Sequence, residues 1–173
     1  METITWKNSD LKGNTFDFEI GNQLLGTLTL LSPLSSNASF DSEKEQIRFS
    51  RVGFWDNKVI LKRNNEFVGE IGNRLVGQTF LKLKSGKTYK LSSNLIGRNL
   101  KWIDSQGVPV VEYSFATLKS MRKGFIVTSN AIDADEKDIL ISSGLIAGWF
   151  NAYRLTIGLL FVALIMNLIP RLV

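Results

Sequence analysis

The side chains of this sequence that could do chemistry are carboxylates and amines, because it contains no cysteine and no histidine. This excludes thiol nucleophiles, disulfides, thiolate or imidazole metal sites, and every serine–histidine or cysteine–histidine arrangement. A glycosidase needs only a pair of carboxylates. The candidates for such a pair are Asp17, Glu19, Asp56, Glu66, Glu70, Asp104 and Glu112. Because they are scattered at alternating, outward-facing positions, we expect no catalytic residues, no cofactor and no enzyme activity.

A second group of carboxylates lies directly before a long apolar stretch, where Asp133–Asp138 reads Asp-Ala-Asp-Glu-Lys-Asp. Acidic side chains at the start of a helix accept hydrogen bonds from free N–H groups and favour the positive end of the helix dipole. Alternate carboxylates also suit calcium. The run lacks the glycine and the distant glutamate of a helix–loop–helix calcium site, so we predict a helix cap and assign no metal ligands, with calcium binding as the alternative.

Basic residues could bind the phosphates of lipids, because the chain carries a formal net charge of +5 and anionic headgroups attract such clusters. The predicted headgroup-binding face consists of Lys82, Lys84, Lys87, Lys90, Lys119, Arg122 and Lys123. The alternative is that these residues are solvated hairpin tips and lysines that protect strand edges. Aromatic and basic residues do not cluster as a base-stacking platform, so we expect no nucleic-acid binding.

The elements that must position these groups are short strands, because no stretch before Asp133 has a sustained helical period. Runs rich in β-branched and aromatic residues alternate with Gly, Asn, Ser and Asp. The twelve predicted strands are Thr3–Trp6, Thr15–Ile20, Gln23–Leu31, Ala38–Asp41, Gln46–Gly53, Lys58–Arg63, Glu66–Ile71, Gln78–Leu83, Lys87–Leu91, Leu100–Ile103, Pro109–Phe115 and Phe125–Thr128. Tight polar turns such as Asn64-Asn65 and Ser85-Gly86 favour antiparallel hairpins. An open sheet of this size would leave long unpaired edges, so we expect a closed barrel or a folded sandwich.

The last part of the chain is a long apolar helix, since Ile139–Ile169 contains one charged residue, Arg154, and no proline. At about 1.5 Å per residue it would span roughly 46 Å, which is more than one membrane crossing requires. Its first half is rich in small residues and suits a tight protein interior, whereas its second half is bulky and apolar on all sides. We therefore divide the chain into a β-region at residues 1–132, an acidic cap and interior helix at 133–153, and a transmembrane tail at 154–173.

The residues around this division are typical of a membrane interface. They are Trp149, Tyr153 and Arg154 on one side of the tail and Arg171 on the other. The start of the chain lacks a basic segment followed by an apolar run, so we expect no signal peptide. These features predict a tail-anchored, single-pass protein whose β-region lies on the cytoplasmic side. The alternative is a helix that is wholly internal.

Four short patterns carry a resemblance to a known superfamily. They comprise Arg51, Gly53, Phe54 and Trp55; Leu83, Gly86, Lys87 and Tyr89; Trp102, Asp104 and Gly107; and Asp135–Asp138 with Gly148, Trp149 and Phe150. Together with the order of twelve strands and one hydrophobic helix, they resemble the tubby C-terminal-like superfamily of tubby domains, LURP-one-related proteins and phospholipid scramblases. The similarity is closest to its small uncharacterised bacterial members. The chain departs from them by adding Thr156–Val173, and it shows no proline-rich head or cysteine cluster of the scramblase type.

The resemblance implies a mainly β fold, with about twelve antiparallel strands closed into a barrel around a central hydrophobic C-terminal helix, which here extends into the membrane tail. It also implies a membrane-associated protein without enzyme activity, and tubby domains bind phosphoinositides. We therefore expect a membrane-anchored barrel that binds lipid headgroups or a protein partner at the membrane surface. The alternatives are a scramblase-like lipid-handling protein and a soluble barrel whose whole C-terminal helix is internal.

Overall fold

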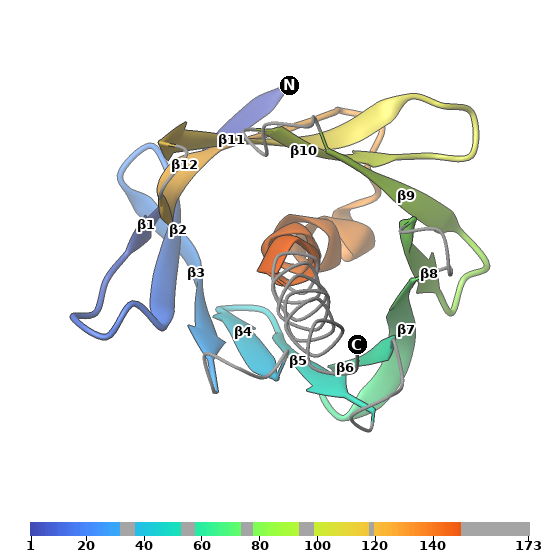
Figure 1. The fold of residues 1–173 in the computed structure, drawn as a ribbon, viewed down its shortest axis with the longest axis horizontal. Coiled ribbons are helices and arrows are strands. Elements are labelled where there is room, and N and C mark those ends of the chain that lie inside the picture. Colours follow the sequence, from blue (N-terminus) through green and yellow to red (C-terminus); the bar gives the residue numbers. More distant parts are fainter. Residues whose placement is uncertain (32–36, 53–57, 74–77, 94–98, 118–119, 150–173) are drawn as a thin grey trace, which may run out of the picture.

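The protein forms a closed antiparallel β-barrel around one helix (Figure 1). The computed structural model describes residues 1–173 except 32–36, 53–57, 74–77, 94–98, 118–119 and 150–173. The strands are β1 (Glu2–Asn8), β2 (Thr15–Ile20), β3 (Gln23–Leu30), β4 (Ala38–Ser42), β5 (Gln46–Arg51), β6 (Lys58–Arg63), β7 (Glu66–Asn73), β8 (Thr79–Leu83), β9 (Thr88–Ser93), β10 (Asn99–Ile103), β11 (Pro109–Thr117) and β12 (Ser120–Thr128). All twelve predicted strands are present, and the barrel rather than the sandwich is confirmed.

Each strand pairs with its neighbours in the sequence, and the circle closes between the first strand and the last. In that closure β1 and β12 pair from Glu2 with Thr128 to Lys7 with Lys123. The turn between β6 and β7 has positive φ angles of 48° at Asn64 and 72° at Asn65, as the predicted asparagine turn requires. Because every strand has two partners, the sheet has no free edge within the described residues.

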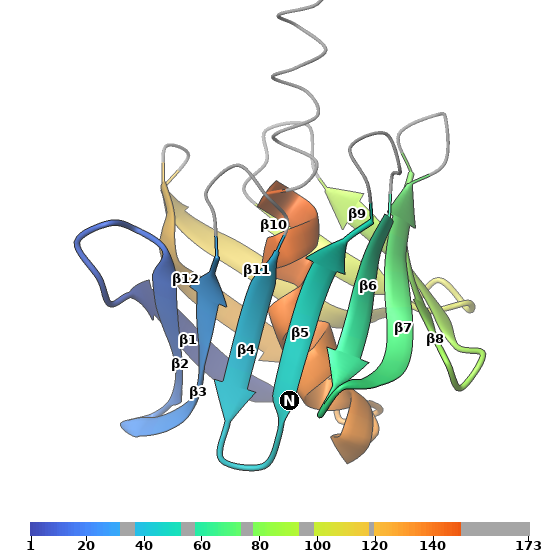
Figure 2. The same cartoon turned by 90° about the horizontal axis from the view of Figure 1, so that it is seen from below.

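The two ends of the barrel differ in what they carry (Figure 2). We call the end with the turns at residues 21–22, 43–45, 64–65, 84–87 and 104–108 the entry rim, because the helix begins there. The opposite end, with residues 9–14 and the last residues of β3, β5, β7 and β9, is the exit rim. The helix therefore runs along the barrel from the entry rim to the exit rim.

Alternate strand residues point inward and form one apolar core. Its largest fully buried side chains include Trp6, Trp102, Phe18, Phe40 and Phe49. The ring centroid of Phe18 lies 5.4 Å from that of Phe40 in an edge-to-face contact. These rings line the barrel wall and leave a central space that the helix fills.

The described part of the helix covers residues 134–149, and every residue from Ile139 to Gly148 is buried. A helix that is buried on all sides needs small residues and satisfied polar groups. The hydroxyl of Ser142 donates to the carbonyl of Asp138 at 2.5 Å, and that of Ser143 donates to the carbonyl of Leu140 at 3.2 Å. The small, polar character of this half of the helix is thus explained by its place inside the barrel.

One side-chain contact fixes the helix against β11. The buried hydroxyl of Tyr113 donates to the helix carbonyls of Leu140 and Ile141. Burial raises its pKa, so the group remains a donor at neutral pH. The ring lies directly against Gly144, where an added Cβ would overlap it. Glycine is therefore required at this position for the helix to approach the wall.

No helix among the described residues is both long enough and apolar enough to cross a membrane. The predicted anchor at residues 154–173 lies outside the described residues, as do Tyr153, Arg154 and Arg171. The predicted boundary between interior helix and anchor therefore stays a prediction.

Replacement of Gly144 by alanine should destabilise the barrel, because the new methyl group would displace the Tyr113 ring. Overpacking of this kind costs about 1–3 kcal/mol. Thermal or urea unfolding of the full chain in detergent measures the loss. Ser143→Ala is the matched control, since its hydroxyl serves only the helix backbone; equal stability of G144A and S143A would contradict the account of this contact.

Candidate functional site

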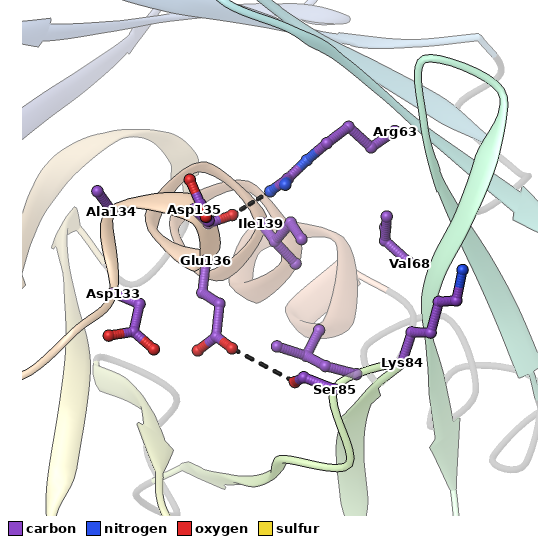
Figure 3. A pocket seen from close by; sticks show the side chains of 10 residues that line it. Arg63, Val68, Lys84, Ser85, Asp133, Ala134, Asp135, Glu136 and Ile139 are labelled. Carbon is purple, nitrogen blue, oxygen red and sulfur yellow. Dashed lines mark hydrogen bonds between the residues drawn. The ribbon is translucent and has the colours of Figure 1, made fainter.

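Charged side chains gather around the helix start at the entry rim, and Glu136 is one of them (Figure 3). Glu136 is only 8% exposed. Its carboxylate accepts hydrogen bonds from Tyr89 at 2.8 Å, Lys87 at 3.1 Å and Ser85 at 3.4 Å. Three groups of β9 and the turn before it thus satisfy one buried carboxylate of the helix.

Lys87 joins this glutamate to a second acidic residue, because its amine also pairs with Asp133. The hydrogen bonds to Asp133 and Glu136 raise the pKa of Lys87. Burial, together with Glu136, raises the pKa of Tyr89. The lysine therefore stays charged and the tyrosine stays a neutral donor over the physiological range, which keeps the cluster intact.

The other side of the helix start is bound in the same manner by other strands. Arg63 of β6 lies 2.8 Å from the carboxylate of Glu45 and donates to the backbone carbonyl of Asp135. Lys137 pairs with a carboxylate at the start of β1, and Ser42 of β4 donates to Asp138 at 3.2 Å. The helix start is thus attached to the barrel around much of the rim.

The acidic run therefore has a structural role that its sequence did not reveal. A helix begins there, as predicted, at residue 134. Its carboxylates bind barrel side chains, and among the described residues none accepts a hydrogen bond from a helix N–H. No group of three or more metal-ligating side chains occurs in the described ranges.

Two hollows flank the first turn of the helix, and both reach Ala134 and Asp135. The one drawn in Figure 3 has a volume of about 490 Å³ and lies between the helix and the turn after β8. The other has a volume of about 510 Å³ and lies beside the β2–β3 and β4–β5 turns. Acidic side chains predominate in the second hollow, where Glu43, Glu45, Asp135 and Asp138 meet Lys44 and Lys137.

Three of the seven carboxylates considered for catalysis form ion pairs across the outer face of the sheet. Glu19 pairs with Lys7 at 2.7 Å, Glu70 with Lys58 at 3.3 Å, and Glu112 with Lys101 at 2.8 Å. Asp17 accepts from Thr27, Asp104 accepts from two N–H groups of its own turn, and Glu66 is exposed. Asp56 lies outside the described residues. The described carboxylates of this group thus lie on different strands and turns, and three of them are held in cross-strand ion pairs.

The structure distributes the predicted headgroup-binding residues over three places. Lys82 and Lys90 line a hollow of about 350 Å³ on the outer face of β8 and β9. Lys84 and Lys87 lie at the entry rim, where Lys87 is held by the helix. Arg122 and Lys123 are exposed on β12, which β10 and β11 separate from β9, and Lys119 lies outside the described residues. The six of these residues that the structure describes therefore lie in three separate places on the barrel.

Trp149, predicted at a membrane interface, is the last described residue of the helix and is half-buried at the exit rim. Its ring centroid lies 4.9 Å from that of Phe16 at the start of β2. This contact marks the point at which the helix reaches the end of the barrel.

Comparisons of the chain with protein-family models, with curated proteins and with solved structures found no match.

Substitution of Glu136 by alanine should destabilise the protein, because it leaves the hydroxyl of Tyr89 buried without its acceptor. The expected loss is about 1–3 kcal/mol. Asp135→Ala is the matched control one position away, since Arg63 binds the backbone carbonyl of Asp135 and the side chain is exposed. It should change the stability by less than about 0.5 kcal/mol. Chemical unfolding of both variants gives the comparison, and a loss for D135A as large as that for E136A would refute the assigned role of Glu136.

Proposed function

We propose that this protein is a membrane-anchored β-barrel that binds lipid headgroups at the membrane surface, with its C-terminal segment as the anchor. The observation that carries this proposal is the position of Trp149. The described helix has already reached the exit rim there, against Phe16. The chain continues for residues 150–173 beyond that point in sequence.

The dimensions of the barrel support an anchor over a wholly internal helix. Residues 134–149 span roughly 24 Å at about 1.5 Å per residue. The strands contain between 5 and 9 residues, so they reach about 17–30 Å along their own direction at about 3.3 Å per residue. The described helix thus extends over about the full length of the barrel, and little of the interior remains for a further segment.

The sequence that follows has the composition of a membrane span. Phe150–Ile169 contains one charged residue, Arg154, near its beginning, and about 20 apolar residues suffice to cross a bilayer. Arg154 lies on the barrel side of this segment in sequence, so the positive-inside tendency favours a cytoplasmic barrel. These residues lie outside the described part of the chain.

The barrel itself favours binding over lipid translocation. Its interior is filled by apolar side chains, and the hydroxyls of Ser142 and Ser143 are bonded to the helix backbone. A lipid headgroup would need a polar path through this interior.

Membership of the tubby C-terminal-like superfamily is part of the proposal, and the order of twelve strands around one C-terminal helix supports it.

Extraction of membranes with alkaline carbonate tests the anchor. The full chain should remain in the pellet, whereas the double variant Leu160→Arg, Leu164→Arg should move to the soluble fraction. Each arginine at the centre of a span costs about 2.5–3.5 kcal/mol on insertion scales. The control places the same two charges on exposed barrel positions, Phe67→Arg and Val108→Arg, and should stay in the pellet. Release of the unmodified chain as a folded, soluble protein would refute the anchor.

A further inference from the structure

We propose that one arc of the exit rim is a bilayer-contacting surface, which inserts apolar side chains among anionic lipids and places lysine and arginine at their phosphates. The arc consists of Leu11, Lys12, Leu31, Val52, Lys58 and Arg122. This inference rests on the proposed membrane anchor, and it names the surface of the barrel that meets the membrane.

The apolar members of the arc are exposed large side chains. Leu11 is fully exposed, Leu31 is 69% exposed and Val52 is 41% exposed. Each follows a different strand, since they come after β1, β3 and β5 respectively. A single exposed apolar side chain needs no explanation, but several on one rim beside the end of the helix suggest a surface that is covered by something apolar.

Hydrogen bonds join these positions into one continuous arc. The N–H of Leu30 donates to the carbonyl of Asn14 at 2.8 Å, which links the β1–β2 turn to β3. The N–H of Leu31 donates to the carbonyl of Asn37 at 3.0 Å. The side chain of Asn37 in turn accepts from the N–H of Arg51 at 2.7 Å. Leu11, Leu31 and Val52 therefore follow one another along the rim.

The first of these leucines is presented by an ordered turn. The carboxylate of Asp10 accepts hydrogen bonds from the side chain of Asn8 at 2.9 Å and from the N–H groups of Asn14 at 2.8 Å and Thr15 at 3.2 Å. Burial alone would raise the pKa of Asp10, but these hydrogen bonds lower it overall. Asp10 thus stays ionised, its carboxylate accepts hydrogen bonds within the turn, and Leu11 and Lys12 are exposed directly after it.

Cations accompany the apolar residues of the arc. Lys12 is exposed in the same turn, and the guanidinium of Arg122 lies 3.9 Å from the place that a Cβ of Gly13 would occupy. Lys58 is exposed where β6 begins, and it also pairs with Glu70 at 3.3 Å. The N–H of Val52 donates to the backbone carbonyl of Lys58 at 3.2 Å, which places the two residues side by side. Apolar side chains with flanking cations are the combination that an anionic bilayer binds.

Both rims expose apolar side chains, so apolar exposure alone does not determine which end of the barrel faces the membrane. The charges beside those side chains distinguish the two rims. The entry rim exposes the apolar side chains of Met1, Leu24, Phe67 and Val108. Acidic residues surround the helix start there, and those beside Leu24 outnumber the lysines. An anionic bilayer repels that rim and attracts the exit rim, where the C-terminal anchor sequence also begins.

The test uses the absence of cysteine from the chain. Single cysteines at Leu11→Cys, Leu31→Cys and Val52→Cys carry an environment-sensitive fluorophore in the full chain. The chain is reconstituted into vesicles of phosphatidylcholine and phosphatidylglycerol, with and without a lipid that carries a quencher near the headgroup. The controls are Leu24→Cys, Phe67→Cys and Val108→Cys, which place the same label on exposed apolar positions of the opposite rim.

The fluorescence of labels on the arc should be quenched by the quencher-carrying lipid, and their emission maximum should shift to the blue. Labels on the entry rim should keep the emission that they have in water. Lys12→Gln in the L31C background should reduce the ratio of lipid-contacting to water-exposed label about fivefold in anionic vesicles. This is the change expected when the attraction of one basic residue to the anionic surface is lost. The substitution should have little effect in vesicles of phosphatidylcholine alone. Vesicle flotation of the same samples reports the anchor separately.

Protein that floats with its vesicles while the arc labels stay in water would overturn this inference and leave the anchor standing. Equal quenching at both rims would also overturn it, because the barrel would then have no preferred end. Protein that fails to float would refute the anchor itself.

Discussion

A barrel of twelve strands encloses more space than its own side chains can fill, and the rest of this structure depends on that constraint. An eight-stranded barrel is just wide enough for its inward residues to meet at the axis. Here the wall contributes large rings such as Trp6, Trp102 and Phe49, and a central space still remains for residues 134–149 (Figure 1). Protein interiors are close-packed, so helix and wall must match in shape. The contact between Gly144 and Tyr113 is the clearest case of that match.

The same constraint explains why charge is concentrated where the helix begins. Apolar packing between the helix and the wall is not directional, so inside the barrel the helix depends on the hydrogen bonds from Tyr113 to the carbonyls of Leu140 and Ile141. At the entry rim further directional contacts are added, because Glu136 meets Lys87 and Tyr89, and Arg63 holds the carbonyl of Asp135. Together these directional contacts set the depth and rotation of the helix, and at its other end the ring of Trp149 packs at a tilt against that of Phe16.

Local patterns were sufficient to predict the strands, the turn at Asn64-Asn65 and the start of the helix, because alternation, turn chemistry and an acidic run are all read from neighbouring residues. The prediction that the barrel closes needed more than local patterns. It used the unpaired edges that an open sheet would leave, together with a family resemblance. The partners of Glu136 could not be predicted, since Lys87 and Tyr89 are distant in sequence and meet it only after the barrel has closed. The distribution of the described lysines over the barrel could not be predicted for a similar reason. Lys82 and Lys90 share an outer face, while the turn carries Lys84 and Lys87 to the rim.

The closure of the barrel by its first and last strands also affects how the chain can fold. Glu2 pairs with Thr128, so one edge of β1 has no partner until β12 has been synthesised. Most other strands need only their immediate neighbours. Contacts between the two ends of a chain form slowly, because a long loop must close before they contribute any stability. The helix follows β12, so the sheet must curl around it late in folding. Until then, a growing sheet with two open edges and an uncovered apolar face is the species most exposed to aggregation.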